Sequence, residues 1–464
     1  MLSSVVDRLY EQYRQSRCVT TDTRQVRPGC IFFAFKGASF DGNALALDAL
    51  EKGAALCVVS NPTYATDDRC ILVDDVLKTL QALALRHRQE LSIPVVGITG
   101  TNGKTTTKEL VRQVLSMRYR VHATPANHNN HLGLPLTILS TPTDAEILVV
   151  EMGANHPGEI ADLCAIALPT CGLITNVGIA HIEGFGSFEG VVHTKTELYR
   201  HLAYVGGTIF VNADNERLMR EADRVCTMPE VASPVPGYLP SYPIADFSNA
   251  GTSVGLYTYG RSEQADVKGS LMESDPYMRF YIENDDTVYT IRTHLLGDYN
   301  FDNAMAAAAV GRFFNVDPFD IKQALEDYQP SNNRSQVKQT ARNTLFLDCY
   351  NANPSSMAVA IENFQHVHAD HKAVILGQMG ELGAVSHAEH QRIVQKLAES
   401  HLDDVILVGD EFRFVLSSPE YSGMRWFESS EALIDHLALS PIEGKTILVK
   451  GSNTNHLWQL EQYL

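Results

Sequence analysis

A glycine-rich loop between an apolar run and a helical pattern is the strongest chemical signal in the sequence. The segment VVGITGTNGKTTTKEL covers residues 95–110. Its glycines let backbone N–H groups turn inward around phosphate oxygens, and the following helix adds the partial positive charge of its N-terminus. Lys104 can reach the β- and γ-phosphates of a nucleotide, and the Thr105 hydroxyl can ligate Mg²⁺. The segment therefore predicts a site for ATP or GTP.

This loop departs from the strict spacing of a phosphate-binding loop. Ile98 stands five positions before Gly103, where that spacing requires glycine, and Gly97 is one position further back. A glycine-rich turn with an incidental lysine is therefore the alternative. The strand before the loop, the helix after it and the GKTTT run favour the nucleotide site. The residues expected to bind the nucleotide are Gly100, Thr101, Asn102, Gly103, Lys104, Thr105 and Thr106.

A carboxylate follows a second apolar run. Glu151 ends the segment EILVVE and precedes Met152-Gly153. The carboxyl end of a strand is where α/β proteins bind ligands, so Glu151 could hold Mg²⁺ together with Thr105. A solvated charge or a helix cap is the alternative, and the apolar run before Glu151 favours the metal-binding interpretation.

Helix and strand patterns alternate through three regions that would position these residues. The chain has 464 residues, and a domain takes roughly 100–200. Residues 1–92 begin with Val5, Leu9 and Tyr13 at helical spacing, and a buried strand is predicted over residues 31–35. A small α/β unit is expected here.

The two later regions repeat the alternation. Residues 93–328 have the pattern of a parallel sheet with covering helices. The elements expected there are strands over 94–99, 146–151 and 171–176, a helix from Lys104, a loop over 228–252, a hairpin over 277–291 and an alanine-rich helix after Asn300. In residues 329–464, strands are predicted over 344–348, 373–376, 404–408 and 446–449.

Composition narrows the class of protein. The net charge of −18 argues against a nucleic-acid-binding surface, which needs clustered Lys and Arg. The eight cysteines have no C-x-x-C spacing, so we expect buried free thiols and no zinc site. No apolar stretch is long enough for a signal peptide or a membrane span, so we expect a cytoplasmic protein without a membrane partner.

Further segments follow the phosphate loop motif in a familiar order. They are DTRQVRPGCIFFAFKGASFDGN (before the loop), ATPANHNNHLGLPLTIL, EMGANHPGEI, TNVGIAHIEGFGS, TKTEL, LLGDYNFDNAMAAAA, LDCYNANPSSM, LGQMGELG and LVKGS. Together with TGTNGKTTT, they resemble the Mur ligase family, whose relatives act on folate and cyanophycin, over nearly the whole chain. YNANP and the ELG element resemble the members that use D-alanyl-D-alanine. The D-N-P-R element of the diaminopimelate-adding members is absent.

The resemblance implies an α/β fold in three domains. Residues 1–92 would form a small N-terminal α/β domain that binds a uridine-nucleotide substrate. Residues 93–328 would form a central P-loop ATPase-type domain with a parallel sheet, and residues 329–464 a Rossmann-like domain that binds the incoming amino substrate and closes on ATP. The segment 329–331 is the expected hinge, because it follows a helix and carries a proline between two α/β units.

The implied reaction is ATP-dependent amide formation. A family member of this kind adds D-alanyl-D-alanine to UDP-N-acetylmuramoyl-tripeptide through an acyl phosphate, in peptidoglycan precursor synthesis. Charge stabilisation and positioning of the reactants do most of the work in such a reaction. The alternatives are a ligase of the same superfamily with other substrates and a non-catalytic ATP-binding switch. We expect a monomer.

The resemblance also implies the catalytic and metal-binding residues. Lys104, Glu151, His181 and Lys195 would be catalytic, and Thr105, Glu151, His181 and Lys195 would hold two Mg²⁺ ions. Without the resemblance, His181 in its glycine-rich loop would be interpreted as structural, and Lys195 as a surface lysine. In the family this lysine carries a carbamate, which replaces a cation that would repel Mg²⁺ with a carboxylate-like group.

Substrate-binding residues are implied in the same way. For ATP they are Asn300 and Asn303 near adenine, Arg334, and Asp348 on the ribose. For the uridine nucleotide and its muramoyl-peptide arm they are Asp22, Arg24, Lys36, Asp41, Gly42, Asn127, Asn129 and Asn130, and for the dipeptide Asn351 and Asn353. A helix cap or a turn is the alternative role for the Asn and Asp residues.

Three positions depart from the family pattern. Asn43 stands where histidine is usual, Gln378 where aspartate is usual, and Asn453 where arginine is common. These departures concern contacts to substrates rather than the reaction.

Overall fold

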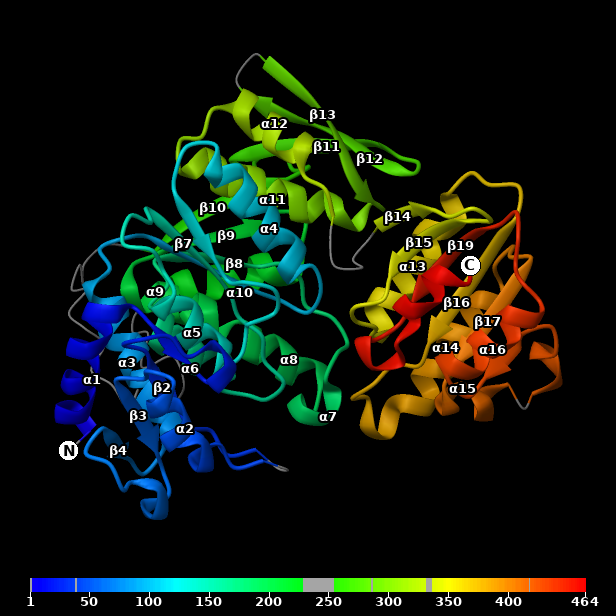
Figure 1. The fold of residues 1–464 in the computed structure, drawn as a ribbon. Coiled ribbons are helices and arrows are strands. Elements are labelled where there is room, and N and C mark those ends of the chain that lie inside the picture. The colour runs from blue at the N-terminus through cyan, green and yellow to red at the C-terminus, as the bar shows by residue number, and fades with distance from the viewer. Residues whose placement is uncertain (1, 38–39, 228–253, 285–286, 331–335, 417) are drawn as a thin grey trace.

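The computed structural model describes residues 2–37, 40–227, 254–284, 287–330, 336–416 and 418–464. Within these residues the strands form three sheets of four, nine and six strands (Figure 1). Each sheet is built from a different stretch of the chain. The α/β fold in three parts expected from the sequence is confirmed.

The first sheet is parallel, in the order β1-β2-β3-β4. Its strands are β1 (Val19–Thr20), β2 (Ile31–Phe33), β3 (Leu56–Val59) and β4 (Cys70–Leu72). The helices around it are α1 (Leu2–Ser16), α2 (Ala46–Glu51), α3 (Val76–Glu90) and the 3₁₀ turns η1 (Thr23–Gln25), η2 (Gly42–Leu45) and η3 (Pro62–Tyr64). The predicted strand over residues 31–35 is thus two residues shorter than expected.

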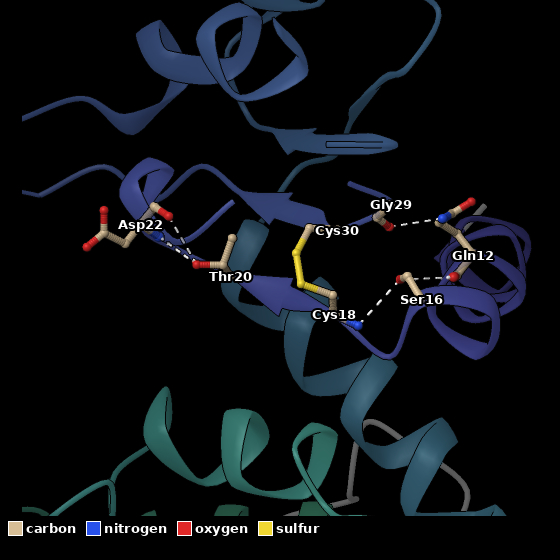
Figure 2. The surroundings of a disulfide bond; sticks show 7 residues. All are labelled: Gln12, Ser16, Cys18, Thr20, Asp22, Gly29 and Cys30. Carbon is tan, nitrogen blue, oxygen red and sulfur yellow. Dashed lines mark hydrogen bonds between the residues drawn. A yellow bond between two sulfur atoms is a disulfide. The ribbon is translucent and has the colours of Figure 1, made fainter. Parts of the chain in front are cut away.

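A disulfide joins the starts of two of these strands. Cys18 precedes β1 and Cys30 precedes β2, and their sulfur atoms are bonded (Figure 2). The parallel register pairs Val19 with Ile31, which brings the two preceding residues opposite each other. The expectation that every cysteine is a free thiol is therefore wrong for this pair, whereas the other six are free.

The second sheet has the order β13-β12-β11-β10-β9-β8-β5-β7-β6. Its strands are β5 (Val95–Thr99), β6 (Val121–Ala123), β7 (Ile147–Glu151), β8 (Cys171–Ile174), β9 (Thr208–Asn212), β10 (Gly255–Gly260), β11 (Val267–Ser274), β12 (Tyr277–Asn284) and β13 (Thr287–Leu296). The sheet is parallel except for the β11-β12-β13 meander, which is antiparallel. The hairpin predicted from alternating residues therefore extends the parallel sheet instead of standing apart from it. The loop predicted over 228–252 lies outside the described residues.

Helices cover both faces of this sheet. They are α4 (Lys104–Ser116), α5 (Gly133–Leu139), α6 (Glu159–Ala167), α7 (Ile182–Phe185), α8 (Phe188–Lys195), α9 (Glu197–Val205), α10 (Glu216–Thr227), α11 (Tyr299–Phe313) and α12 (Pro318–Asp327). Successive residues of a strand point to opposite faces. Accordingly Val96 and Ile98 pack with α4 and α11, whereas Val95 belongs to a core that continues into α1 and α3. The first two regions therefore share one core.

The third sheet has the order β14-β15-β19-β16-β17-β18, with only β14 antiparallel. Its strands are β14 (Gln336–Gln339), β15 (Thr344–Asp348), β16 (Lys372–Gly377), β17 (Asp404–Val408), β18 (Arg425–Phe427) and β19 (Thr446–Lys450). Its helices are α13 (Pro354–His366), α14 (Ser386–Ala398), α15 (Asp410–Val415), α16 (Ser430–Leu439) and the 3₁₀ turns η4 (Gly383–Val385), η5 (Pro419–Tyr421), η6 (Asn453–Asn455) and η7 (Leu457–Gln462). The strands predicted in this region are confirmed. No helix in the described part of the chain is long and apolar enough to cross a membrane.

Candidate active site

The glycine loop connects β5 to α4, as its sequence predicts. Gly103 has a φ of +78° and precedes the first residue of α4. A Cβ built on Gly103 would lie 2.5 Å from Oδ1 of Asn303, so no larger residue fits. The Lys104 ammonium folds back over the loop and donates to the carbonyl oxygens of Gly100 (2.8 Å) and Thr101 (3.0 Å). The loop thus has the backbone shape of a phosphate cradle.

Glu151 is buried at the end of β7, beside the start of α4. The Thr105 hydroxyl donates to its Oε2 (2.8 Å), and the Asn129 amide donates to its Oε1 (2.7 Å). A hydroxyl and a carboxylate oxygen at this separation fit the oxygen ligands that Mg²⁺ prefers. The fold therefore brings together Thr105 and Glu151, the two residues proposed for the first ion from their sequence positions.

The segment between β6 and α5 carries the three asparagines expected to bind the muramoyl-peptide arm. Asn129 and Asn130 line the main cavity. Asn130 also caps the turn into α5, because its side-chain oxygen accepts from the N–H groups of Leu132 (3.1 Å) and Gly133 (2.8 Å). Asn127 is exposed and does not line that cavity.

His181 directly precedes α7, and Lys195 is the last residue of α8. His181 has a φ of +50° and pairs with Glu381 from the third region. Burial lowers the pKa of His181, and the Glu381 carboxylate acts in the opposite direction. Lys195 ends α8 with only 2% of its surface exposed, and its ammonium lies 3.5 Å from the carbonyl oxygen of Ala154. Burial, together with the positive charge of Lys104, lowers the pKa of Lys195 to about 7.

Asn300 and Asn303 are buried in the first turns of α11, against the phosphate loop. Asn303 accepts from the Thr107 hydroxyl (3.0 Å) and donates to Asn300 (2.9 Å). Asn300 in turn donates to the carbonyl oxygen of Leu296 (2.8 Å). Both residues line the cavity described below, so they contact the start of α4 and can also contact a ligand.

Residues of the third region reach the phosphate loop. Asn353 caps α13 and also donates from its amide to Oδ1 of Asn102 (2.8 Å). Asp348 ends β15 and accepts from the buried Lys450 ammonium (2.5 Å), which also donates to the carbonyl oxygen of Asn351 (3.2 Å). Arg334 lies outside the described residues.

Most of these groups line one cavity of about 960 Å³, whereas Lys195 and Asn353 are not part of its wall. Its wall includes Leu77 and Gln81 from α3, the phosphate loop with Glu151, and Asp348 with Asn351 from the third region. All three regions of the chain therefore contribute to a single space that is large enough for several ligand groups.

The five residues expected on the uridine nucleotide lie away from that cavity wall. Arg24 lines a second cavity of about 400 Å³ beside β1. Hydrogen bonds from Arg24 lower the pKa of Asp22 to about 2. Lys36 and Asp41 form an isolated bridge, and Gly42 is required because a Cβ there would lie 2.5 Å from the carbonyl oxygen of Phe35.

The three departures from the family pattern have local structural roles. The buried Asn43 accepts from the N–H groups of Ser60 (2.8 Å) and Asn61 (3.2 Å). Gln378 accepts from the N–H of Glu411 (3.1 Å) at the start of α15. Asn453 is exposed, and its backbone N–H donates to the carbonyl oxygen of Tyr350 (3.0 Å).

Sequence reasoning missed several residues of this site. Lys450 and Glu381 stand in the recognised segments LVKGS and LGQMGELG, but neither was singled out. Their partners Asp348 and His181 are distant in sequence. Lys450 could have been found from its place at the end of a predicted strand, since parallel strands end at the same edge.

Three family models match the chain. They are "Mur ligase family, catalytic domain" over residues 16–88, "Mur ligase middle domain" over 98–229 and "Mur ligase, glutamate ligase domain" over 333–453. The matched segments fall in the three regions that carry the three sheets.

Relatives match nearly end to end. The UDP-N-acetylmuramoyl-tripeptide--D-alanyl-D-alanine ligase of Bacillus subtilis (strain 168) is 32% identical, over 95% of this chain and 92% of the relative. The crystal structure of MurF from Acinetobacter baumannii superposes with a TM-score of 0.80 at 28% identity, covering 95% of this chain and 92% of that one. The MurF ligase from Thermotoga maritima in complex with ADP gives a TM-score of 0.78 at 28% identity, and 97% of each chain is covered.

Proposed function

The chain belongs to the Mur ligase family, and we propose that it is the ATP-dependent ligase that adds D-alanyl-D-alanine to UDP-N-acetylmuramoyl-tripeptide in peptidoglycan precursor synthesis. The observation that carries this proposal is the single cavity walled by the phosphate loop, Glu151 and the YNANP segment. Relatives that match over nearly the whole chain bear the name of this ligase, which supports the choice of substrates.

The reaction has two steps. A carboxylate oxygen of the precursor attacks the γ-phosphorus of ATP, the bond to ADP breaks, and an acyl phosphate forms. The dipeptide amine then attacks the acyl carbon, loses a proton and expels phosphate to give the amide. The backbone N–H groups of the loop and the Lys104 ammonium would hold the phosphates in line and stabilise the transferred charge.

Thr105 and Glu151 would hold one Mg²⁺, and His181 with a modified Lys195 a second. Bound Mg²⁺ would neutralise charge on the phosphate oxygens. Among the described residues no three His, Cys, Asp or Glu side chains gather into a metal-binding group. In nucleotide sites Mg²⁺ is usually bound by one or two carboxylates together with substrate phosphates and water, so such a group is not required.

We propose that Lys195 carries a carbamate in the active protein. An ammonium at this position would repel a neighbouring Mg²⁺, whereas a carbamate supplies oxygen ligands. The side chain is buried, and its contacts hold an ammonium only weakly: the Ala154 carbonyl oxygen lies 3.5 Å from the nitrogen and the Phe185 ring centroid 5.4 Å from it. Its lowered pKa supports the same conclusion, because CO₂ adds to the neutral amine.

We also propose which region of the chain binds each substrate. Residues 1–92 would bind the uridine nucleotide through Asp22, Arg24, Lys36, Asp41 and Gly42, and residues 93–328 would bind ATP. Residues 329–464 would bind the dipeptide through Asn351 and Asn353 and contact the ATP ribose through Asp348. Asn129 and Asn130 would meet the peptide arm, since they line the cavity between α3 and the loop. We place the protein in the cytoplasm, with its nucleotide substrates, as a monomer.

ATP turnover with UDP-N-acetylmuramoyl-tripeptide, with and without D-alanyl-D-alanine, tests the proposal. We expect phosphate release that depends on both substrates and a product whose mass equals the tripeptide precursor plus the dipeptide minus water. Lys104→Ala is the inactive control, since it removes the mobile phosphate-binding cation. Turnover with another amine but not the dipeptide would identify a different ligase, and ATP binding without any substrate-stimulated hydrolysis would identify a switch.

A further inference from the structure

Lys108 is a fully buried cation that the proposed reaction does not use. It lies on α4 one turn after Lys104 and Thr105, and its side chain has 0% of its surface exposed. Its ammonium donates to the carbonyl oxygens of Thr124 (2.7 Å) and Ala126 (3.3 Å) and pairs with Oε1 of Glu109 (2.8 Å). Burial of an ammonium is costly unless such partners are present.

The two carbonyl groups belong to the segment 124–130, which connects β6 to α5. Ala126 has a φ of +47°, which a non-glycine residue adopts only at some cost. At the other end of the segment, the carbonyl oxygen of Asn129 accepts from the N–H of Gly153 (2.7 Å). Lys108 therefore fixes the first half of the segment, and the strand end at Glu151 fixes the second half.

This segment also orients Glu151. Its carboxylate has one oxygen on Thr105 and the other on the Asn129 amide. The backbone N–H of Glu151 donates to the Thr124 hydroxyl (3.0 Å). Helix α4 thus reaches the carboxylate twice, directly through Thr105 and indirectly through Lys108 and the segment that carries Asn129.

We propose that Lys108 is a positioning residue that holds the segment 124–130 so that Asn129 orients the Glu151 carboxylate. It would tie the phosphate-loop helix to the proposed metal site and to the wall that meets the precursor. The inference rests on the proposed function for the identity of the ligands. It goes beyond that function in assigning a role to a lysine that does not line the cavity.

Mn²⁺ binding in the presence of ADP, followed by electron paramagnetic resonance, tests the role without requiring turnover. Lys108→Met should weaken Mn²⁺ binding by about tenfold, the usual effect of removing a group that orients a metal ligand. Lys108→Arg should restore part of the affinity. Arg112→Met is the matched control, because Arg112 pairs with the same Glu109 on the same helix (2.9 Å) but does not hold the carbonyl groups of the segment. It should change the affinity less than twofold.

A double variant separates positioning from a general loss of stability. Asn129→Ala should weaken Mn²⁺ binding to a similar extent, and adding Lys108→Met to it should have little further effect, since both act through the same carboxylate. Multiplicative effects of the two changes, or wild-type affinity in a folded Lys108→Met protein, would overturn the proposal. If Lys108→Met does not fold, the Lys108→Arg and Asn129→Ala pair gives the same cycle. Absence of dipeptide-dependent turnover in the wild type would count against the proposed function alone.

Discussion

Buried lysines play different roles in this molecule according to their partners. Lys450 is held by a carboxylate and a carbonyl oxygen, and Lys108 by two carbonyl oxygens and a carboxylate. Lys195 has one carbonyl oxygen at 3.5 Å and the face of the Phe185 ring, and burial lowers its pKa to about 7. Because an amine in this state is partly neutral near neutral pH, Lys195 is suited to modification, whereas Lys450 and Lys108 are suited to holding backbone in place.

Carbamate formation at Lys195 should follow pH in a definite direction. The folded-state pKa lies below the ordinary value for lysine, so the amine becomes neutral as pH rises through about 7. At constant dissolved CO₂, we expect the carbamate to increase from pH 6 to pH 8, with ¹³C NMR of protein equilibrated with ¹³CO₂ as the measurement. Lys195→Arg should give no carbamate resonance at this site. A resonance of constant intensity over this pH range would contradict the argument.

Site residues could be paired from the sequence where their positions relative to predicted strands decide where they lie. The pairing of Thr105 with Glu151 rests on their places after one predicted strand and at the end of another, and the fold puts the Thr105 hydroxyl 2.8 Å from Oε2 of Glu151. Asn129 was assigned to substrate, and its bond to Glu151 was not foreseen, because it depends on how the segment after β6 folds back over β7. Side-chain contacts of this kind follow from tertiary packing and not from spacing along the chain.

At the scale of helices and strands, one helix cap also contacts the phosphate loop and another does not. The Asn353 side chain accepts from the N–H of Ser356 at the start of α13 and donates to Asn102 in the phosphate loop. Ser429 caps α16 and does not line the cavity. Asn353→Ala and Ser429→Ala should each destabilise the protein by about 1 kcal/mol. Only Asn353→Ala should also raise KM for ATP, because it loosens the loop at Asn102. Equal KM values in the two variants would show that the contact with the loop is unimportant for the nucleotide.

The disulfide between the residues that precede β1 and β2 also stabilises neighbouring elements. It closes a short loop, with a sequence separation of 12, and a cross-link of this size stabilises the native state by about 3 kcal/mol, chiefly by restricting the unfolded chain. We expect reduction to speed hydrogen exchange at the amides of β1 and β2 and leave β16 and β17 unaffected. Cys18→Ser should reproduce the effect without reductant. Alkylation of the unreduced, denatured protein should label six cysteines, and labelling of eight would exclude the disulfide.

The limits of sequence reasoning differ for elements and for their arrangement. Apolar runs such as residues 404–408 predicted strands whose bounds the structure reproduces. The pattern could not predict that β11 pairs in parallel with β10 and joins an antiparallel meander to the sheet, since pairing partners leave no periodic signal. The Cys18–Cys30 bond was missed for the same reason: it depends on the register of β1 and β2.

At the scale of the whole molecule, the first two regions pack closely together, and the third region is attached to them through fewer contacts. The Tyr13 hydroxyl of α1 donates to the carbonyl oxygen of Leu139 (2.6 Å), and the buried Arg88 of α3 donates to those of Ala167 (2.8 Å) and Leu168 (3.1 Å). With the shared core, these bonds make the first two regions one unit. The third region contacts the second through fewer groups. They include Leu296 at the end of β13, which packs into the core of the third region, and the polar pairs Asn353 with Asn102 and His181 with Glu381. The sequence predicts that the third region closes on ATP, and the shared core indicates that the first two regions stay together when it does.

We therefore predict that the third region moves against the other two as one body. Residues 329–330 follow α12 and remain the expected hinge, while Ser331 of that segment lies outside the described residues. A free protein that exchanges between this arrangement and more open ones should be shifted toward it by ligands that bridge the cavity, and closure would protect an acyl phosphate from water.

Small-angle scattering with and without an ATP analogue plus the UDP-precursor measures this motion. We expect the radius of gyration to fall on ligand addition. Glu381→Ala should enlarge the free form, because it removes a contact from the third region to His181. Glu362→Ala is its control, since Glu362 pairs with Lys396 within the third region (3.4 Å) and should leave the radius unchanged. The first two regions share buried side chains, so a distance probe between α1 and α5 should not respond. A change in that distance as large as the change between α4 and α13 would show that three bodies move and not two.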